Sequence, residues 1–233
     1  MSDKGEVRRW IRRWEGEGAQ QRGVWAERRR LAEAVRRVIE RLTTTEAPEP
    51  ELRVAADRME QYAEHLGTNP RHRRYEGYAE SATAGSAPEG GGHFDWSPLI
   101  GRANPLAPPI VMRTEGDRVD GRVTFGTAYE GPPGCVHGGF VAAAFDEVLG
   151  YAQALTGNPG FTGTLTVRYR TPTPLHTELT FDAGVDRVEG RKIFASSTLH
   201  AGDCLCAEGE GIFISVDRSK YMDLIEKRQL KLD

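Results

Sequence analysis

The stretch PPGCVHGGFVAAAFDEVLG, residues 132–150, decides how this chain is expected to fold. Most of its second half is apolar, a pair of glycines precedes the apolar run, and Gly157 and Pro159 follow its end. Glycine or proline at such positions is typical of helix boundaries. The pattern predicts a long helix over residues 139–155, whose small and apolar side chains belong in a core or at a subunit interface.

Two adjacent acids, Asp146 and Glu147, interrupt this apolar run. An ionised carboxylate is costly to remove from water, so it needs a charged partner, bound water or a cleft. In a structural interpretation, one of the two acids pairs with a cationic side chain, such as Arg168 or Arg170. In a functional interpretation, one of them is a general base or nucleophile, because a carboxylate in a partly dry site is more basic and more nucleophilic than one in water.

The motif His137-Gly138-Gly139 stands where the predicted helix begins. The first N–H groups of a helix have no internal partners and carry the positive end of its dipole, so they can stabilise an oxyanion. Asp146 lies seven residues after Gly139, which corresponds to about 10 Å along a helix. One carbonyl group cannot readily touch both in one chain. We therefore expect the donor and the acid of one site to come from two subunits related by a two-fold axis.

Strand patterns flank the helix on both sides. Two segments with a Glu-Gly-Asp turn between them precede it and read as a hairpin. Four segments that alternate or are rich in β-branched and aromatic residues follow it. In order, the six segments are 110–114, 118–125, 161–174, 178–190, 191–202 and 204–217. The sequence predicts an α+β domain over residues 94–216, in which an antiparallel sheet of five or six strands wraps the helix.

An N-terminal extension, residues 1–70, is expected to hold a helical hairpin. Apolar residues recur there at spacings of three and four, first Leu31, Val35, Val38, Ile39 and Leu42, and then Leu52, Ala55, Met59, Ala63 and Leu66. We interpret the hairpin as a lid or an oligomer-packing element, because interleaved acids disfavour nucleic-acid binding by its arginines. Residues 71–93 are expected to be a linker or loop, and residues 217–233 a tail that could include a helix.

The composition disfavours several classes of partner. The 233 residues carry a net charge of only −3, so no global basic field favours nucleic acid or an anionic membrane. No run approaches the roughly 20 apolar residues that span a bilayer, and no secretory h-region is evident. Three cysteines, an odd number, suit a reducing compartment. We expect a soluble protein of the cytoplasm.

The cysteines offer two rival sites. Cys135 could act as a nucleophile with His137, but their spacing does not ensure contact between the thiol and the imidazole. Cys204 and Cys206 share a strand face and could ligate a metal. No further ligand stands at a suitable spacing, so small core residues are favoured instead, and no metal or redox cofactor is expected.

The motif residues resemble those of a known family. GPPGCVHGGFVAAAFDEVLG (131–150) and TGTLTVRYRTPTPL (162–175) are similar to hotdog-fold thioesterases of the PaaI type, and within them to the THEM group of acyl-CoA thioesterases. HGG with an aspartate nine positions after the histidine, followed by L-x-V-x-Y-x-x-P-x-P, carries this resemblance over about residues 94–216. It implies a hotdog fold and a homodimer or dimer of dimers that hydrolyses acyl-CoA, with coenzyme A present only as part of the substrate.

The resemblance also implies roles for single residues. Asp146 matches the catalytic acid, Gly139 the oxyanion donor, and His137 the histidine that orders the turn; Thr162 matches a functional threonine that could hold the attacking water. The residues implied in substrate binding are Gly138, Arg168, Arg170, Arg191 and Lys192, although the four cations could equally be solvated strand charges. The asparagine that many PaaI-type sequences carry shortly before HGG has no counterpart here.

Two other functions remain open at this point. A non-catalytic module that binds acyl-CoA or an acyl carrier would keep the fold without the chemistry. An enoyl-thioester hydratase would need an Asp/His pair in a hydratase-type motif, which this sequence does not show.

Overall fold

The computed structural model describes residues 23–70, 95–158 and 160–215. The predicted linker and the predicted C-terminal tail lie outside the described residues, as do the first 22. The described elements are helices α2 (Val24–Thr44), α3 (Glu49–Gly67) and α5 (Gly138–Ala154), the short 3-10 helix η1 (Thr127–Tyr129), and strands β1 (Val111–Glu115), β2 (Arg118–Val123), β3 (Gly160–Tyr169), β4 (Leu179–Glu189), β5 (Lys192–Ala201) and β6 (Cys204–Ser215).

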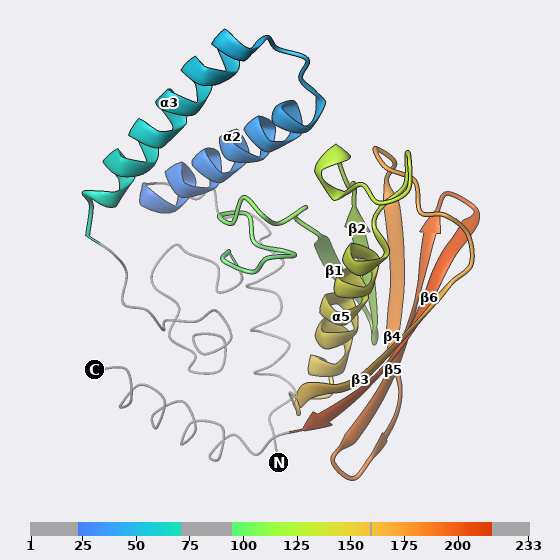
Figure 1. Ribbon diagram of the computed structural model, residues 1–233. Coiled ribbons are helices and arrows are strands. Elements are labelled where there is room, and N and C mark those ends of the chain that lie inside the picture. The colour runs from blue at the N-terminus through green and yellow to red at the C-terminus, as the bar shows by residue number, and fades with distance from the viewer. Residues whose placement is uncertain (1–22, 71–94, 159, 216–233) are drawn as a thin grey trace.

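The six strands form one antiparallel sheet in the order β1-β2-β4-β5-β6-β3. The sheet curves around α5, which lies against its concave face (Figure 1). The chain enters the helix from β2 and leaves it into β3, so the helix connects the two parts of the sheet. This is the hotdog arrangement, and the predicted α+β fold class is confirmed.

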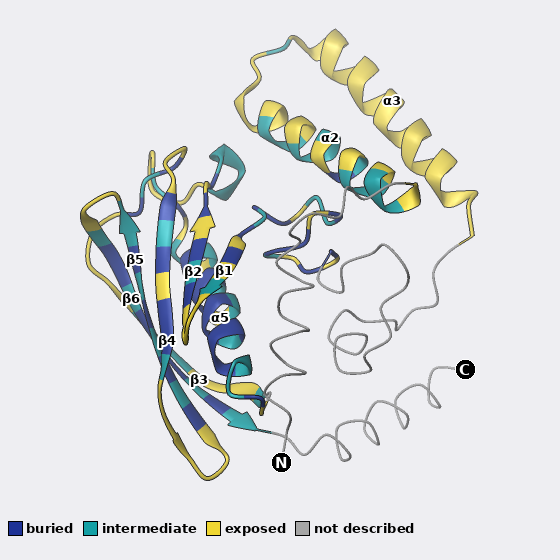
Figure 2. Ribbon diagram, turned by 180° about the vertical axis from the view of Figure 1, so that it is seen from behind, coloured by how far each residue is buried: buried dark blue, intermediate teal, exposed yellow. Residues whose placement is uncertain are grey.

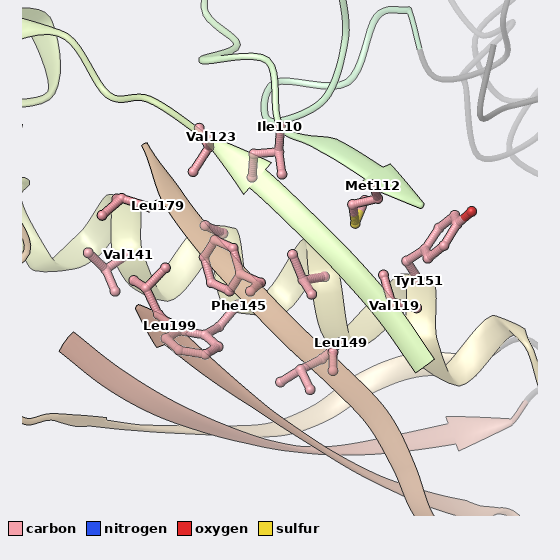
Figure 3. Packing of buried hydrophobic residues seen from close by; sticks show 14 of the residues in the cluster. Ile110, Met112, Val119, Val123, Val141, Phe145, Leu149, Tyr151, Leu179 and Leu199 are labelled. Atoms are coloured by element: carbon pink, nitrogen blue, oxygen red, sulfur yellow. The ribbon is translucent and has the colours of Figure 1, made fainter. Parts of the chain in front are cut away.

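The core lies between α5 and the sheet. Side chains of Val141, Phe145 and Leu149, one to two turns apart on the helix, point into the space under the strands (Figure 3). The ring of Phe145 meets Phe181 of β4 edge to face at 5.2 Å between centroids. A Cβ atom at Gly209 of β6 would lie 2.4 Å from the Phe145 ring, so only glycine admits this ring against the strand. Burial of each such side chain contributes about 1.5–3 kcal/mol.

The two N-terminal helices differ in how they meet this domain. Arg29 of α2 donates to both carboxylate oxygens of the buried Asp95, at 3.0 and 2.8 Å. Glu40 of α2 accepts the backbone N–H of Thr127 at 3.2 Å. Helix α3, by contrast, buries none of its residues, and its whole surface is exposed (Figure 2).

Candidate active site

The turn before α5 is held from several directions. The Gly134 N–H donates to the side chain of Glu130 at 2.6 Å, and the Val136 N–H donates to the carbonyl of Thr173 at 2.8 Å. His137, the last residue before the helix, donates its N–H to the carbonyl of Tyr129 at 2.8 Å. Glu130 thus fixes the loop that precedes the helix. These bonds make the entry into the helix rigid before any ligand arrives.

His137 caps α5 with its side chain. The Gly139 N–H donates to His137 Nδ1 at 3.0 Å, which satisfies one of the orphan donors of the first turn. An imidazole nitrogen that accepts carries no proton, so the structure requires the tautomer with hydrogen on Nε2. The sequence predicted an ordering role for His137, and the observed cap gives that role a geometry.

This cap alters the assignment of the oxyanion donor. The predicted donor, the Gly139 N–H, already has an acceptor in His137 Nδ1. Within the described parts of the chain, the Gly138 N–H has no hydrogen-bond acceptor. The group free to meet an oxyanion is therefore the N–H of Gly138, one residue earlier. The sequence-based prediction had Gly138 among the substrate-binding residues, but could not tell which N–H the histidine accepts from.

Asp146 and Thr162 meet across the helix and the sheet. Thr162 Oγ1 donates to Asp146 Oδ1 at 2.7 Å, and both residues are exposed in the single chain. The hydroxyl contacts the acid directly, and the role implied by the resemblance, holding the attacking water, stays a prediction. In the described residues, nothing donates to the second carboxylate oxygen, Oδ2. Asp146 is thus held in one orientation while one oxygen stays free to accept a proton.

A β-bulge puts Thr162 on the helix side of the sheet. The pairing of β3 with β6 shifts by one residue between Thr162 and Thr164, which leaves Gly163 without a partner. Side chains alternate along a strand, so an unbroken β3 would place Thr162 on the outer face with Arg168. Because of the bulge, Thr162 lies opposite the buried Phe213 and reaches the helix. No pattern in the sequence announces this bulge beyond the glycine itself.

The two adjacent acids have different surroundings. Asp146 is exposed, whereas its neighbour Glu147 is partly buried. Loss of water, and to a smaller extent the charge of Asp146, raises the pKa of Glu147 to about 7. In the described residues, neither acid forms an ion pair with Arg168, Arg170 or another cation, so the structural interpretation gains no support. The desolvated acid is Glu147, and Asp146 is the acid that a ligand can reach.

Of the arginines predicted to bind coenzyme A, Arg168 lies on the outer face of β3 and Arg170 directly follows the strand. Arg168 pairs with Glu210 at 2.5 Å and Arg170 with Glu208 at 2.6 Å, both across to β6. These exposed pairs are weak, so a polyphosphate could displace the glutamates at little cost. The structure brings the two guanidinium groups onto one face, as expected, but neutralises each of them.

Arg191 and Lys192 lie near the other end of β3. Lys192 pairs in register with Ile214 of β6, which in turn pairs with Phe161 at the start of β3. Both cations are exposed, and Arg191 Nε donates to the carbonyl of Ser215 at 3.1 Å. The structure therefore does not gather the four predicted cations in one place in a single chain.

A hollow of about 320 Å³ opens beside the start of α5. Its walls include Cys135, Gly138 and Val141 from the turn and helix, and Tyr169 and Thr173 from β3 and the segment after it. It lies at the end of the helix that carries the free Gly138 N–H, and Asp146 does not line it. The Gly138 N–H and the Asp146 carboxylate thus face different spaces in one chain.

The rival cysteine sites gain no support. All three cysteines are free thiols. Within the described residues, no hydrogen bond joins Cys135 to His137, whose Nδ1 is occupied by the helix cap. Cys206 is buried and Cys204 exposed, and the described part of the chain contains no cluster of three or more residues able to hold a metal ion.

Comparison with known proteins agrees with this geometry. Residues 133–207 match the Thioesterase superfamily. A solved structure described as a thioesterase superfamily protein is 34% identical, with a TM-score of 0.69, over 80% of this chain and 94% of that protein. The chain belongs to the thioesterase superfamily. The shared 80% exceeds the hotdog domain, so the similarity also includes part of the N-terminal extension.

Curated relatives match the hotdog domain alone. The chain is 36% identical to acyl-coenzyme A thioesterase THEM4 of Xenopus laevis over 39% of this chain and 42% of that protein. It is 32% identical to human acyl-coenzyme A thioesterase THEM5 over 39% of this chain and 38% of that protein. The matched region thus spans about two fifths of the length of these relatives. In the described residues, no helix is long and apolar enough to cross a membrane.

Proposed function

We propose that this chain hydrolyses an acyl-CoA thioester to a free acid and coenzyme A. The observation that carries the proposal is the bond from Thr162 Oγ1 to Asp146 Oδ1 at 2.7 Å, which leaves a fixed, accessible carboxylate oxygen. The names of the relatives that match the hotdog domain support the substrate class. The motif residues His137, Gly138 and Asp146 are all present, as a catalyst requires.

In the proposed reaction, Asp146 Oδ2 accepts a proton from water as the water oxygen attacks the thioester carbonyl. The negative charge that develops on the carbonyl oxygen meets the Gly138 N–H and the positive end of the α5 dipole. Collapse of the tetrahedral intermediate breaks the carbon–sulfur bond. Asp146 then returns its proton to the thiolate of coenzyme A. Attack by Asp146 itself, through an anhydride that water later opens, uses the same groups and remains the alternative route.

The distance along the helix requires two chains for one such site. Gly138 and Asp146 are eight residues apart, which is about 12 Å of helix. Strand β3 ends the sheet, with β6 on one side and no described strand on the other. We propose that two copies of β3 pair antiparallel, as an exposed strand edge favours. The Gly138 end of one subunit then lies beside the Thr162 end of its partner, and higher assembly follows from contacts outside this pair.

The antiparallel arrangement also gives the cations a role. Arg168 and Arg170 lie at one end of β3, and Arg191 and Lys192 lie across the sheet from its other end. Pairing of two β3 strands would bring the two sets together at each shared site, next to the polyphosphate of coenzyme A. We propose these four residues as substrate-binding groups that act between subunits.

We also propose which cofactors and which compartment the reaction uses. Its steps use only protein groups and water, so we propose that no metal or redox cofactor takes part. Free thiols at Cys135, Cys204 and Cys206 support work in a reducing compartment such as the cytoplasm.

Thiol release from a panel of acyl-CoA esters of different chain length tests the function. The wild type and Asp146→Asn are compared with Glu147→Gln, which makes the same chemical change one residue further along the helix. We expect release by the wild type and by Glu147→Gln, and a loss of at least about 10²-fold in Asp146→Asn. If calorimetry detects binding of the esters but no thiol is released from any of them, the chain is instead a non-catalytic binding module.

A further inference from the structure

Tyr169 is the last residue of β3, and its hydroxyl donates to the carbonyl oxygen of Gly138 at 2.7 Å. Its ring lies so close to the helix start that a Cβ atom at Gly138 would be 3.4 Å from the ring carbon Cζ. The ring is still 55% exposed and forms one wall of the hollow beside the helix. The tyrosine belongs to the motif on β3, but no role was predicted for it from the sequence.

The carbonyl of Gly138 and the N–H of Gly139 belong to one peptide group. Tyr169 binds the carbonyl end of this group, and His137 Nδ1 accepts from its N–H end at 3.0 Å. One peptide plane is therefore clamped at both ends, by a strand side chain on one side and by the helix cap on the other. Rotation of this plane would break both hydrogen bonds at once.

Such a clamp matters because two glycines adjoin here. Glycine costs more backbone entropy to order than any other residue, so a Gly-Gly start is the least rigid way to begin a helix. The free Gly138 N–H lies on the peptide just before the clamped one, and its direction depends on the Gly138 backbone angles. An oxyanion donor contributes most when it is already oriented before the charge develops.

We propose that Tyr169 is a positioning residue, which holds the Gly138–Gly139 peptide so that the Gly138 N–H points at the thioester oxygen. This inference rests on the proposed thioesterase activity. Tyr169 itself acts through Gly138 and takes no part in proton transfer. Loss of the Tyr169 hydroxyl should therefore affect stability and catalysis differently. An exposed hydrogen bond adds little to stability, but a misdirected donor loses much of its effect on the transition state.

The test compares Tyr169→Phe with Tyr151→Phe, which removes a hydroxyl 3.3 Å from Thr114 Oγ1 at the far end of the same helix. Three quantities are measured for each: kcat and KM with the best ester of the wild type, the melting temperature, and amide hydrogen exchange at Gly139. For Tyr169→Phe we expect kcat to fall about tenfold with KM within about twofold, and faster exchange at Gly139. Its melting temperature should stay within about 3 °C of the wild type.

Tyr151→Phe should leave kcat and the Gly139 exchange rate unchanged. Wild-type kcat in Tyr169→Phe, or a rise in KM in place of the fall in kcat, would overturn the positioning role. A wild type that releases no thiol from any ester refutes the proposed function and with it the catalytic role of the clamp. Exchange at Gly139 then still decides whether Tyr169 holds the peptide, since that measurement needs no turnover.

Discussion

Helices α5 and α3 are almost equal in length, at 17 and 19 residues, but differ completely in burial. Eight residues of α5 are buried beneath the sheet, whereas α3 buries none, although Leu52, Met59 and Leu66 give it an apolar stripe. Regular apolar spacing therefore identifies a helix without saying what covers it. The difference teaches that the sheet, and not the helix pattern, decides where stability and chemistry reside in this chain.

The largest effect should come from truncating the core side of α5. Phe145→Ala removes a fully buried ring that packs on Phe181 and Gly209, and should lower the free energy of unfolding by about 3–5 kcal/mol. The matched change on α3, Met59→Ala, should lie within about 0.5 kcal/mol of the wild type, because Met59 is exposed. Urea denaturation of both variants measures the contrast. A large loss for Met59→Ala would mean that α3 is covered in solution.

The starts of the two helices should differ just as sharply in function. Gly138→Pro removes the free N–H at the first position of α5, where proline is well tolerated, so the fold should survive. We expect turnover to fall about 10²- to 10³-fold, as for the loss of one oxyanion donor. Glu49→Pro makes the same change at the start of α3 and should leave turnover unchanged. Circular dichroism controls for folding, and unaltered turnover in Gly138→Pro would refute the assignment of the donor.

Glu147 should make stability depend on pH. Its pKa is raised to about 7, so between about pH 4.5 and pH 7 the folded state holds more protons than the unfolded state. The free energy of unfolding should therefore fall as pH rises through this window and then level off, by up to about 3 kcal/mol in total. Glu147→Gln should flatten this part of the profile, and Glu51→Gln on the exposed α3 should not. An equally steep profile in Glu147→Gln would assign the titration to another group.

A smaller effect is expected where α2 meets the domain. Arg29→Met leaves the buried Asp95 carboxylate without its bidentate partner and should cost about 2 kcal/mol. Hydrogen exchange should speed up in α2 and stay unchanged in α5. Arg53→Met is the control, because the pair of Arg53 with Glu49 on α3 is exposed and contributes little. Equal acceleration in both helices would mean that α2 is part of the cooperative core.

The elements of the fold could largely be predicted from the sequence. Alternation and turn residues located all six strands, and the spacing of small and apolar residues located α5 to within one residue at each end. The order of the strands in the sheet could not be predicted from these local patterns, because it depends on which strands pair after the chain turns. The exposure of α3 could not be predicted either, because the periodicity of a helix does not show which surface packs against it.

The site was predicted in part. The resemblance to hotdog-fold thioesterases singled out Asp146 and Thr162, and the structure joins the two side chains by a hydrogen bond. Two features could not be predicted because each depends on a tertiary contact: the bulge at Gly163 and the desolvation of Glu147. The capture of the Gly139 N–H by His137 is local, but the sequence does not show which N–H of the first turn the imidazole accepts from. The ion pair of Arg168 with Glu210 could not be predicted either, because it depends on the register between β3 and β6.

The central claim is that one site takes its acid from one subunit and its oxyanion donor from another. Differently tagged Asp146→Asn and Gly138→Pro chains, refolded together and purified as mixed dimers, test it most directly. In such a dimer one of the two shared sites is intact, so we predict thiol release at about half the wild-type rate, although each variant alone is nearly inactive. Mixed dimers as inactive as the separate variants would contradict the account and place both groups of a site in a single chain.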